Sequence, residues 1–182
     1  MLRVISGTAR GLRLTSPSGD ATRPTLDNVK EAIFSMLFDK VGDAKVLDLF
    51  AGSGALGIEA LSRGAALCVF SDKSKEAVRV IGENLEKSRT KDRAKVINAD
   101  FIDTLSRLSS EGQKFDIIFL DPPYAKDFLG QALEKIASLS LLENGGVVVA
   151  ELDDGTDFDT QKFRICKDKK YGRVRINFLE AL

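Results

Sequence analysis

Residues 48–57 read Asp-Leu-Phe-Ala-Gly-Ser-Gly-Ala-Leu-Gly, and they continue a short apolar run. This run predicts a buried strand over residues 46–50, and the pattern of residues 55–63 predicts a short helix. Gly52 and Gly54 lie between the two and let the backbone turn sharply and approach a ligand, because glycine has no Cβ. The stretch predicts a strand, a loop and a helix, and it leaves open whether the loop binds a ligand or is only a tight turn.

Apolar runs and helical patterns alternate along the rest of the chain. The further runs that predict strands are residues 67–70, 95–98, 115–120 and 146–152. Strands separated by helices predict a parallel sheet that helices cover on both faces. Residues 162–170 and 172–179 read as two strands without a helix between them. We therefore expect an α/β, Rossmann-like fold whose mostly parallel seven-stranded sheet ends in a C-terminal antiparallel hairpin.

The N-terminal residues differ in character from the rest. Arg3-Val-Ile-Ser-Gly and Gly11-Leu-Arg-Leu are short alternating runs around a turn, which predicts a small β-hairpin. We expect a basic hairpin arm over residues 1–24 and the α/β domain over residues 25–182. The arm contains one acid, Asp20, and the arginines Arg3, Arg10, Arg13 and Arg23. The first helix of the domain should carry one apolar face, formed by Val29, Ile33, Phe34, Leu37 and Phe38.

The composition excludes several classes of chemistry. A chain of 182 residues with 43% hydrophobic and 30% charged residues is typical of one globular domain. The sequence has no histidine, which excludes a Ser-His-Asp triad and any histidine metal ligand. Cys68 and Cys166 lie far apart and form no metal or redox motif, so we expect buried thiols and no metal. No apolar run approaches the ~20 residues that span a bilayer, and we expect a cytoplasmic monomer without a membrane partner.

Acidic residues follow two of the expected strands. Asp72 ends the second strand, where a carboxylate can accept hydrogen bonds from both hydroxyls of a ribose, or is simply solvated. Asp100 follows the third strand, where an acid could accept from an adenine amino group while Phe101 packs on the ring or lies in the core. The glycine loop contains no lysine for a phosphate, which disfavours a P-loop. Adenosine without phosphates fits best, and S-adenosylmethionine is the common cofactor of that description.

Asp121-Pro122-Pro123-Tyr124 directly follows the fourth strand. In doubly wound sheets, the carboxyl ends of the first and fourth strands flank the main ligand crevice. The prolines fix the backbone, so we expect the Pro122 carbonyl to be a rigid acceptor beside the Asp121 carboxylate. Two acceptors and the aromatic face of Tyr124 suit a planar exocyclic amine. Hydrogen bonds from both N–H groups to these acceptors favour the tetrahedral nitrogen that attacks a methyl sulfonium. The alternative is that the prolines only stiffen the backbone where the strand ends.

These motifs carry a family resemblance. Asp121-Pro-Pro-Tyr and Phe50-Ala-Gly-Ser-Gly-Ala-Leu-Gly resemble the methyltransferases that modify exocyclic nitrogens of nucleobases. The block at residues 3–14 and Arg23-Pro-Thr-Leu-Asp-Asn-Val-Lys-Glu-Ala-Ile-Phe more narrowly resemble the bacterial 16S rRNA (guanine-N2)-methyltransferase family (RsmD-type). The similarity runs nearly end to end and includes Lys170-Tyr-Gly. Ser6 departs from it, because the family usually has a second glycine there.

The resemblance implies a class I S-adenosylmethionine-dependent methyltransferase that methylates N2 of guanine 966 in 16S rRNA, as naked RNA, in the 30S subunit or in an assembly intermediate. The implied catalytic residues are Asp121, Pro122, Pro123 and Tyr124. The implied cofactor-binding residues are Asp48, Phe50, Ala51, Gly52, Ser53, Gly54, Leu56, Gly57, Asp72, Lys73, Asp100 and Phe101. The implied RNA-binding residues are Arg3, Arg10, Arg13, Arg23, Thr25, Lys170 and Arg173.

Three other functions remain open. An adenine-N6 methyltransferase for RNA or DNA would share the tetrapeptide, although DNA-specific members usually carry a recognition domain for which 182 residues leave little room. A non-catalytic RNA-binding ribosome assembly factor would bind RNA without consuming the cofactor. A nicotinamide oxidoreductase would need a third loop glycine at the dinucleotide spacing and a proton donor, such as tyrosine with lysine, and we expect neither in this chain.

Overall fold

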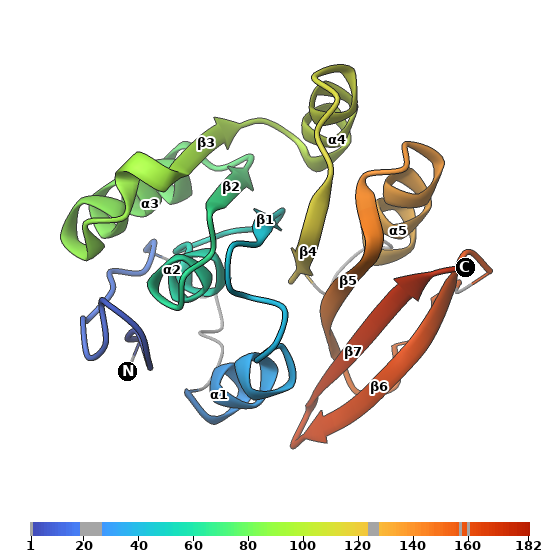
Figure 1. The fold of residues 1–182 in the computed structure, drawn as a ribbon, viewed down its shortest axis with the longest axis horizontal. Coiled ribbons are helices and arrows are strands. Elements are labelled where there is room, and N and C mark those ends of the chain that lie inside the picture. The colour runs from blue at the N-terminus through green and yellow to red at the C-terminus, as the bar shows by residue number, and fades with distance from the viewer. Residues whose placement is uncertain (1, 19–26, 124–127, 157, 160) are drawn as a thin grey trace.

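The computed structural model describes residues 2–18, 27–123, 128–156, 158–159 and 161–182. Its centre is a seven-stranded sheet with the order β3-β2-β1-β4-β5-β7-β6 (Figure 1). The first five strands pair in parallel, and β7 pairs antiparallel with both β5 and β6. The expected fold class is confirmed, including the antiparallel hairpin at the end.

The elements follow the predicted alternation closely. The strands are β1 (Lys45–Asp48), β2 (Leu67–Asp72), β3 (Ala94–Asn98), β4 (Phe115–Leu120), β5 (Leu142–Asp153), β6 (Phe163–Tyr171) and β7 (Val174–Ala181). The helices are α1 (Asp27–Met36), α2 (Ala55–Ser62), α3 (Lys75–Ser88), α4 (Phe101–Ser110) and α5 (Phe128–Ser138), with a short 3₁₀ turn, η1, at Lys91–Arg93.

Helices cover the sheet on both faces, and successive strand residues divide between two cores. Val46 and Phe119 belong to the core that contains residues of α1, α2 and α3. Leu47 and Ile118 belong to the core that contains residues of α4 and α5. This division is why the strands read as continuous apolar runs, since both faces of a parallel sheet are buried.

The strand order creates a switch point between β1 and β4. The chain passes from β1 outward to β2 and β3, and then returns to pair β4 with the other side of β1. The segments that leave the carboxyl ends of these two strands therefore lie side by side at one edge of the sheet (Figure 1). One is the glycine loop and the other begins with Asp121, as the sequence predicted.

The N-terminal residues form the expected hairpin, and within the described residues 2–18 it contains one bridge, between Arg3 and Arg13. Val4 N donates to Leu12 O at 2.9 Å, and Gly11 N donates to Val4 O at 2.8 Å. Leu2, Val4 and Leu14 are buried in the same core as α1 and α2. Residues 2–14 thus pack on the α/β domain, and the predicted boundary between residues 24 and 25 lies outside the described residues.

A buried ion pair joins this segment to two helices. The side chains of Lys30 in α1 and Glu59 in α2 are both 0% exposed, and Lys30 Nζ lies 3.3 Å from Glu59 Oε2. Glu59 also accepts hydrogen bonds from Ile5 N at 2.7 Å and Ser6 N at 3.0 Å. Lys30 in turn donates to the carbonyl of Arg3. Burial lowers the pKa of Lys30, and the adjacent Glu59 carboxylate opposes that effect.

Two expectations about burial were wrong. Phe38 is 80% exposed, because α1 ends at Met36 and the helical face does not extend to residue 38. Cys68 is a buried thiol as expected, but Cys166 is exposed on β6 at the edge of the sheet. None of the described helices is long and apolar enough to cross a membrane.

Gly57→Ala should destabilise the protein by about 1–3 kcal/mol, because it overpacks the contact between α2 and β2. A Cβ at Gly57 would lie 2.3 Å from Phe70 Cε1 and 2.7 Å from Cys68 Sγ. Urea unfolding followed by circular dichroism measures the difference.

Gly82→Ala is the matched control, since Gly82 lies within α3 and a Cβ there meets no atom within 4 Å. It should leave stability unchanged or raise it by up to ~1 kcal/mol, because alanine is the better helix former. Equal unfolding midpoints for Gly57→Ala and the wild type would contradict this account of the α2–β2 contact.

Candidate active site at the carboxyl edge of the sheet

The glycine loop connects β1 to α2 in a conformation that favours glycine at two positions. Gly52 and Gly54 have φ angles of 54° and 77°, in the left-handed region. Gly54 N donates to Ala51 O at 2.6 Å, and Ala51 N donates to Ser71 O of β2 at 3.0 Å. These bonds fix the loop over the carboxyl ends of β1 and β2.

Two aspartates from neighbouring strands hold the loop. Asp72 Oδ2 accepts from Gly52 N at 2.9 Å, and its Oδ1 accepts from Ser74 N at 2.8 Å. Asp48 is 3% exposed and accepts from Gly57 N at 3.0 Å. Burial raises the pKa of Asp48 to about 7. Both carboxylates therefore shape the loop through backbone N–H groups, and Asp72 lies directly beside its first glycine.

The loop glycines differ in what they contact. The expectation that the loop lacks the third glycine of a dinucleotide loop was wrong, because Gly52, Gly54 and Gly57 have that spacing. The spacing alone therefore does not distinguish ligand classes. The missing Cβ of Gly57 makes room for Phe70 and Cys68 of β2, which is a packing contact. Of the other predicted loop residues, Ala51 and Leu56 are buried and Ser53 is half-buried.

The segment after β4 places a carboxylate among other carboxylates. Asp121 is half-buried, Pro122 is buried and Pro123 is exposed. Burial, followed by the nearby carboxylates of Glu151 and Asp48, raises the pKa of Asp121 well above its usual value. Asp121 follows Leu120, which pairs with Ala150, so the register brings it opposite Glu151 of β5. Sequence reasoning missed Glu151, although an acid inside an apolar strand is a signal worth noting.

Three phenylalanines form a cluster beside the loop, on the face of α4 and α5. The ring centroids of Phe50 and Phe101 are 5.2 Å apart, and those of Phe101 and Phe128 are 5.5 Å apart. Lys73 Nζ lies 5.7 Å from the Phe128 centroid. Phe101 is buried in this core, and Phe128 was not foreseen from the sequence. The side chain of Asp100 caps α4 by accepting from Ile102 N at 3.0 Å.

The predicted RNA-binding residues lie in two places. Arg3, Arg10 and Arg13 are exposed on the N-terminal hairpin, where Arg3 Nε is 2.8 Å from Asp27 Oδ2. Lys170 and Arg173 flank the β6–β7 turn, and they border an open hollow with Asp153, Asp154 and Gly172.

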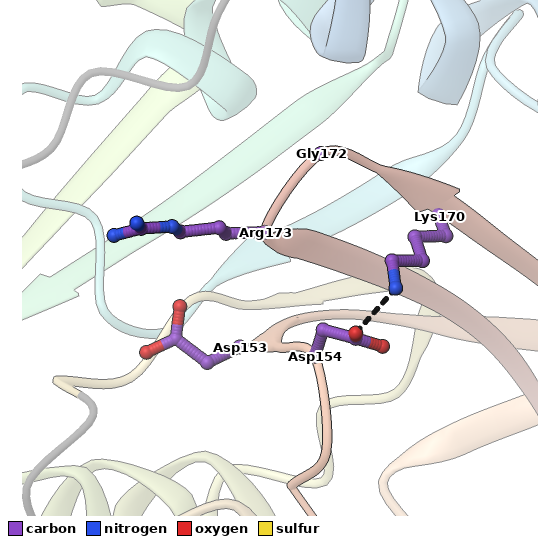
Figure 2. A pocket seen from close by; sticks show the side chains of 5 residues that line it. All are labelled: Asp153, Asp154, Lys170, Gly172 and Arg173. Atoms are coloured by element: carbon purple, nitrogen blue, oxygen red, sulfur yellow. Dashed lines mark hydrogen bonds and ion pairs between the residues drawn. The ribbon is translucent and has the colours of Figure 1, made fainter.

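Figure 2 shows that Lys170 points toward Asp154, with which it forms an ion pair, whereas the Arg173 side chain extends away from that pair. Val174 pairs with Asp153 at the end of β5, so this turn lies at the same sheet edge as the segment that begins with Asp121. Tyr124, Arg23 and Thr25 lie outside the described residues. Within the described part of the chain, no group of three or more acidic or cysteine side chains could hold a metal ion.

Comparison with solved structures identifies proteins that share the fold of this chain. A solved structure from Escherichia coli, described as the putative methyltransferase yhhF, has a TM-score of 0.84 and 28% identity and covers 98% of this chain and 97% of its own. Two solved methyltransferases with bound S-adenosylhomocysteine share only 15% and 18% identity, at TM-scores of 0.70 and 0.65, which shows the fold alone.

Sequence relatives define the family. The putative rRNA methyltransferase YlbH of Bacillus subtilis is 42% identical over 152 residues, which are 84% of this chain and 83% of that protein. Ribosomal RNA small subunit methyltransferase D of Escherichia coli is 32% identical over 181 residues, covering 95% of this chain and 86% of that protein. A family model described as "Conserved hypothetical protein 95" matches residues 2–180. The chain therefore belongs to the RsmD-type methyltransferase family that this model describes.

Proposed function

We propose that the protein transfers a methyl group from S-adenosylmethionine to the exocyclic N2 of guanine 966 in 16S rRNA. The observation that carries this proposal is the position of Asp121, Pro122 and Pro123 directly after β4, beside the glycine loop of β1 at the switch point. Small-subunit rRNA is named as the substrate of the relative from Escherichia coli. The N2 position and the particular guanine are the finer part of the proposal.

The residues around the loop fit S-adenosylmethionine, which supplies an activated methyl group. Asp72 has a carboxylate at the loop, suited to accept hydrogen bonds from the hydroxyls of a ribose. The half-buried Phe50, which packs on the buried Phe101, offers apolar surface for an adenine, with Asp100 next to them. Residues 48–57 contain no lysine or arginine that would neutralise a phosphate, so an adenosine that carries an amino acid fits better than one that carries phosphates.

Asp121 has two tasks in this mechanism. Its carboxylate would accept a hydrogen bond from one N–H of the guanine amine, and the Pro122 carbonyl would accept one from the other. Both hydrogen bonds favour the tetrahedral nitrogen that can attack the methyl carbon. The bound cofactor would supply the methyl group and keep the electron pair of the broken S–CH3 bond as a neutral thioether, so the methylated nitrogen would carry the positive charge and would have to release a proton. The raised pKa of Asp121 suits its carboxylate to take that proton. Catalysis otherwise consists of positioning and polarisation.

Exposed cations on two separate segments would hold the RNA. The hairpin of residues 2–14 presents Arg10 and Arg13, and the β6–β7 turn presents Arg173 at the edge that carries Asp121. The chain as a whole has no net charge, so these local groups must supply the phosphate contacts. Guanine 966 must leave its stack to reach Asp121, and a loop base leaves at lower cost than a paired one.

Incubation with labelled cofactor and undermethylated 30S subunits should place the label in N2-methylguanosine. The product is identified by digestion of the RNA and mass spectrometry of its nucleosides. Label in N6-methyladenosine would instead support the adenine-N6 alternative. RNA binding without any transfer would support the assembly factor.

Asp121→Ala should lower the turnover rate by about 10²–10³, because one positioned acceptor is lost in the transition state. Single-turnover assays at saturating cofactor measure the loss. Asp103→Ala, which removes an exposed carboxylate of α4, should retain the wild-type rate. A folded Asp121→Ala protein with activity within tenfold of the wild type would assign the tetrapeptide a structural role only.

Asp72→Ala should weaken cofactor binding more than it lowers turnover at saturation. Contacts to ribose hydroxyls hardly change between the ground and transition states, so their loss raises KM rather than lowering kcat. Loss of the acceptor for Gly52 N should weaken binding further, because the loop is less fixed. Calorimetry with S-adenosylhomocysteine measures the affinity, and an unchanged value would exclude Asp72 from the cofactor site.

A further inference from the structure

Asn84 of α3 contacts the N-terminal segment and the glycine loop at once. Its side chain is 0% exposed. Nδ2 donates to Thr15 O at 2.8 Å and to Ser53 O at 2.9 Å. Oδ1 accepts from Thr15 N at 2.9 Å. One buried amide therefore holds both backbone polar groups of Thr15 and one carbonyl of the loop.

The geometry of an amide links these three bonds. The carboxamide of Asn84 is planar, so its two N–H groups and its oxygen keep fixed directions relative to one another. If Thr15 shifts, the amide must turn, and the N–H that reaches Ser53 turns with it. A buried polar group that loses its hydrogen bond destabilises the folded state, because no water replaces the lost partner, so the three partners are held in register.

Other contacts between α3 and this segment do not involve the loop. Lys87 Nζ donates to Thr15 Oγ1 at 2.7 Å. Glu76 Oε1 accepts from Ser18 N at 2.9 Å and also from the Ser18 hydroxyl. Among these three α3 side chains, in the part of the chain that the structure describes, only Asn84 also bonds to the loop.

We propose that Asn84 is a positioning residue that couples cofactor binding at the glycine loop to RNA binding by the N-terminal segment. The inference rests on the proposed function, which assigns the cofactor to Gly52–Gly54 and RNA to residues 3–13. A ligand that fixes the Ser53 carbonyl fixes the amide, and the amide fixes Thr15 just beyond Arg13. Coupling of this kind is reciprocal, so RNA must raise cofactor affinity by the same factor.

The test measures the dissociation constant of undermethylated 16S RNA by filter binding, with and without saturating S-adenosylhomocysteine. In the wild type, S-adenosylhomocysteine should tighten RNA binding about fivefold or more, the lower end of common coupling factors. In Asn84→Ala this ratio should fall to about one. Turnover at saturation with both substrates should change less than the ratio does.

Lys87→Met is the matched control. It removes a contact with the same Thr15 but leaves the bond to Ser53 intact, so the ratio should stay at the wild-type value. A folded Asn84→Ala protein that keeps the wild-type ratio, or a wild type whose ratio is one, overturns the inference. Failure of the wild type to bind S-adenosylhomocysteine or RNA at all would contradict the proposed function instead.

Hydrogen exchange of the wild type tests the coupling even if Asn84→Ala does not fold. S-adenosylhomocysteine should slow amide exchange in residues 13–18, because the amide that holds Thr15 becomes fixed. Exchange in η1, which lies beyond the end of α3, should remain the same. Unchanged exchange in residues 13–18 on S-adenosylhomocysteine binding overturns the inference.

Discussion

The arrangement of the N-terminal half depends on the contacts of one buried carboxylate, that of Glu59. An ionised side chain at 0% exposure loses its hydration, and a buried ion costs several kcal/mol unless partners replace the water. Here the partners come from α1, from the N-terminal segment and from Arg63, whose Nε lies 2.8 Å from Glu59 Oε1. Glu59 is part of α2, which begins directly after the glycine loop. The same carboxylate thus holds α2, which follows the loop, and the N-terminal segment that donates to it.

The strands, and their alternation with helices along the chain, could be predicted because the parallel sheet is buried on both faces. Each strand reads as an apolar run, and the glycine loop and Asp121 follow two of these runs directly. The edge hairpin could also be predicted, since residues 162–179 contain two strands and no helix. Phe38 was misplaced because the helical pattern continues in the sequence beyond the residue at which α1 ends.

The buried polar contacts could not be predicted. In the sequence, Lys30, Glu59 and Asn84 look like residues on the solvent face of a helix, and only the tertiary packing buries them. Their partners lie far away in the chain, and many of these are backbone groups, which carry no sequence signal. Glu151 had a sequence signal, as an acid within an apolar strand, but its position opposite Asp121 had none, because the β4–β5 register is a property of the folded sheet.

The hairpin of residues 2–14 has a consequence for the order of folding during synthesis. Ile5 N and Ser6 N lie 54 and 53 positions before their acceptor Glu59, and Thr15 pairs with Asn84, which lies 69 positions later. Closing loops of this length costs entropy that only the completed contacts offset. Residues 2–14 can therefore complete their contacts with the domain only after α2 and α3 have been synthesised, whereas each helix closes its own hydrogen bonds locally.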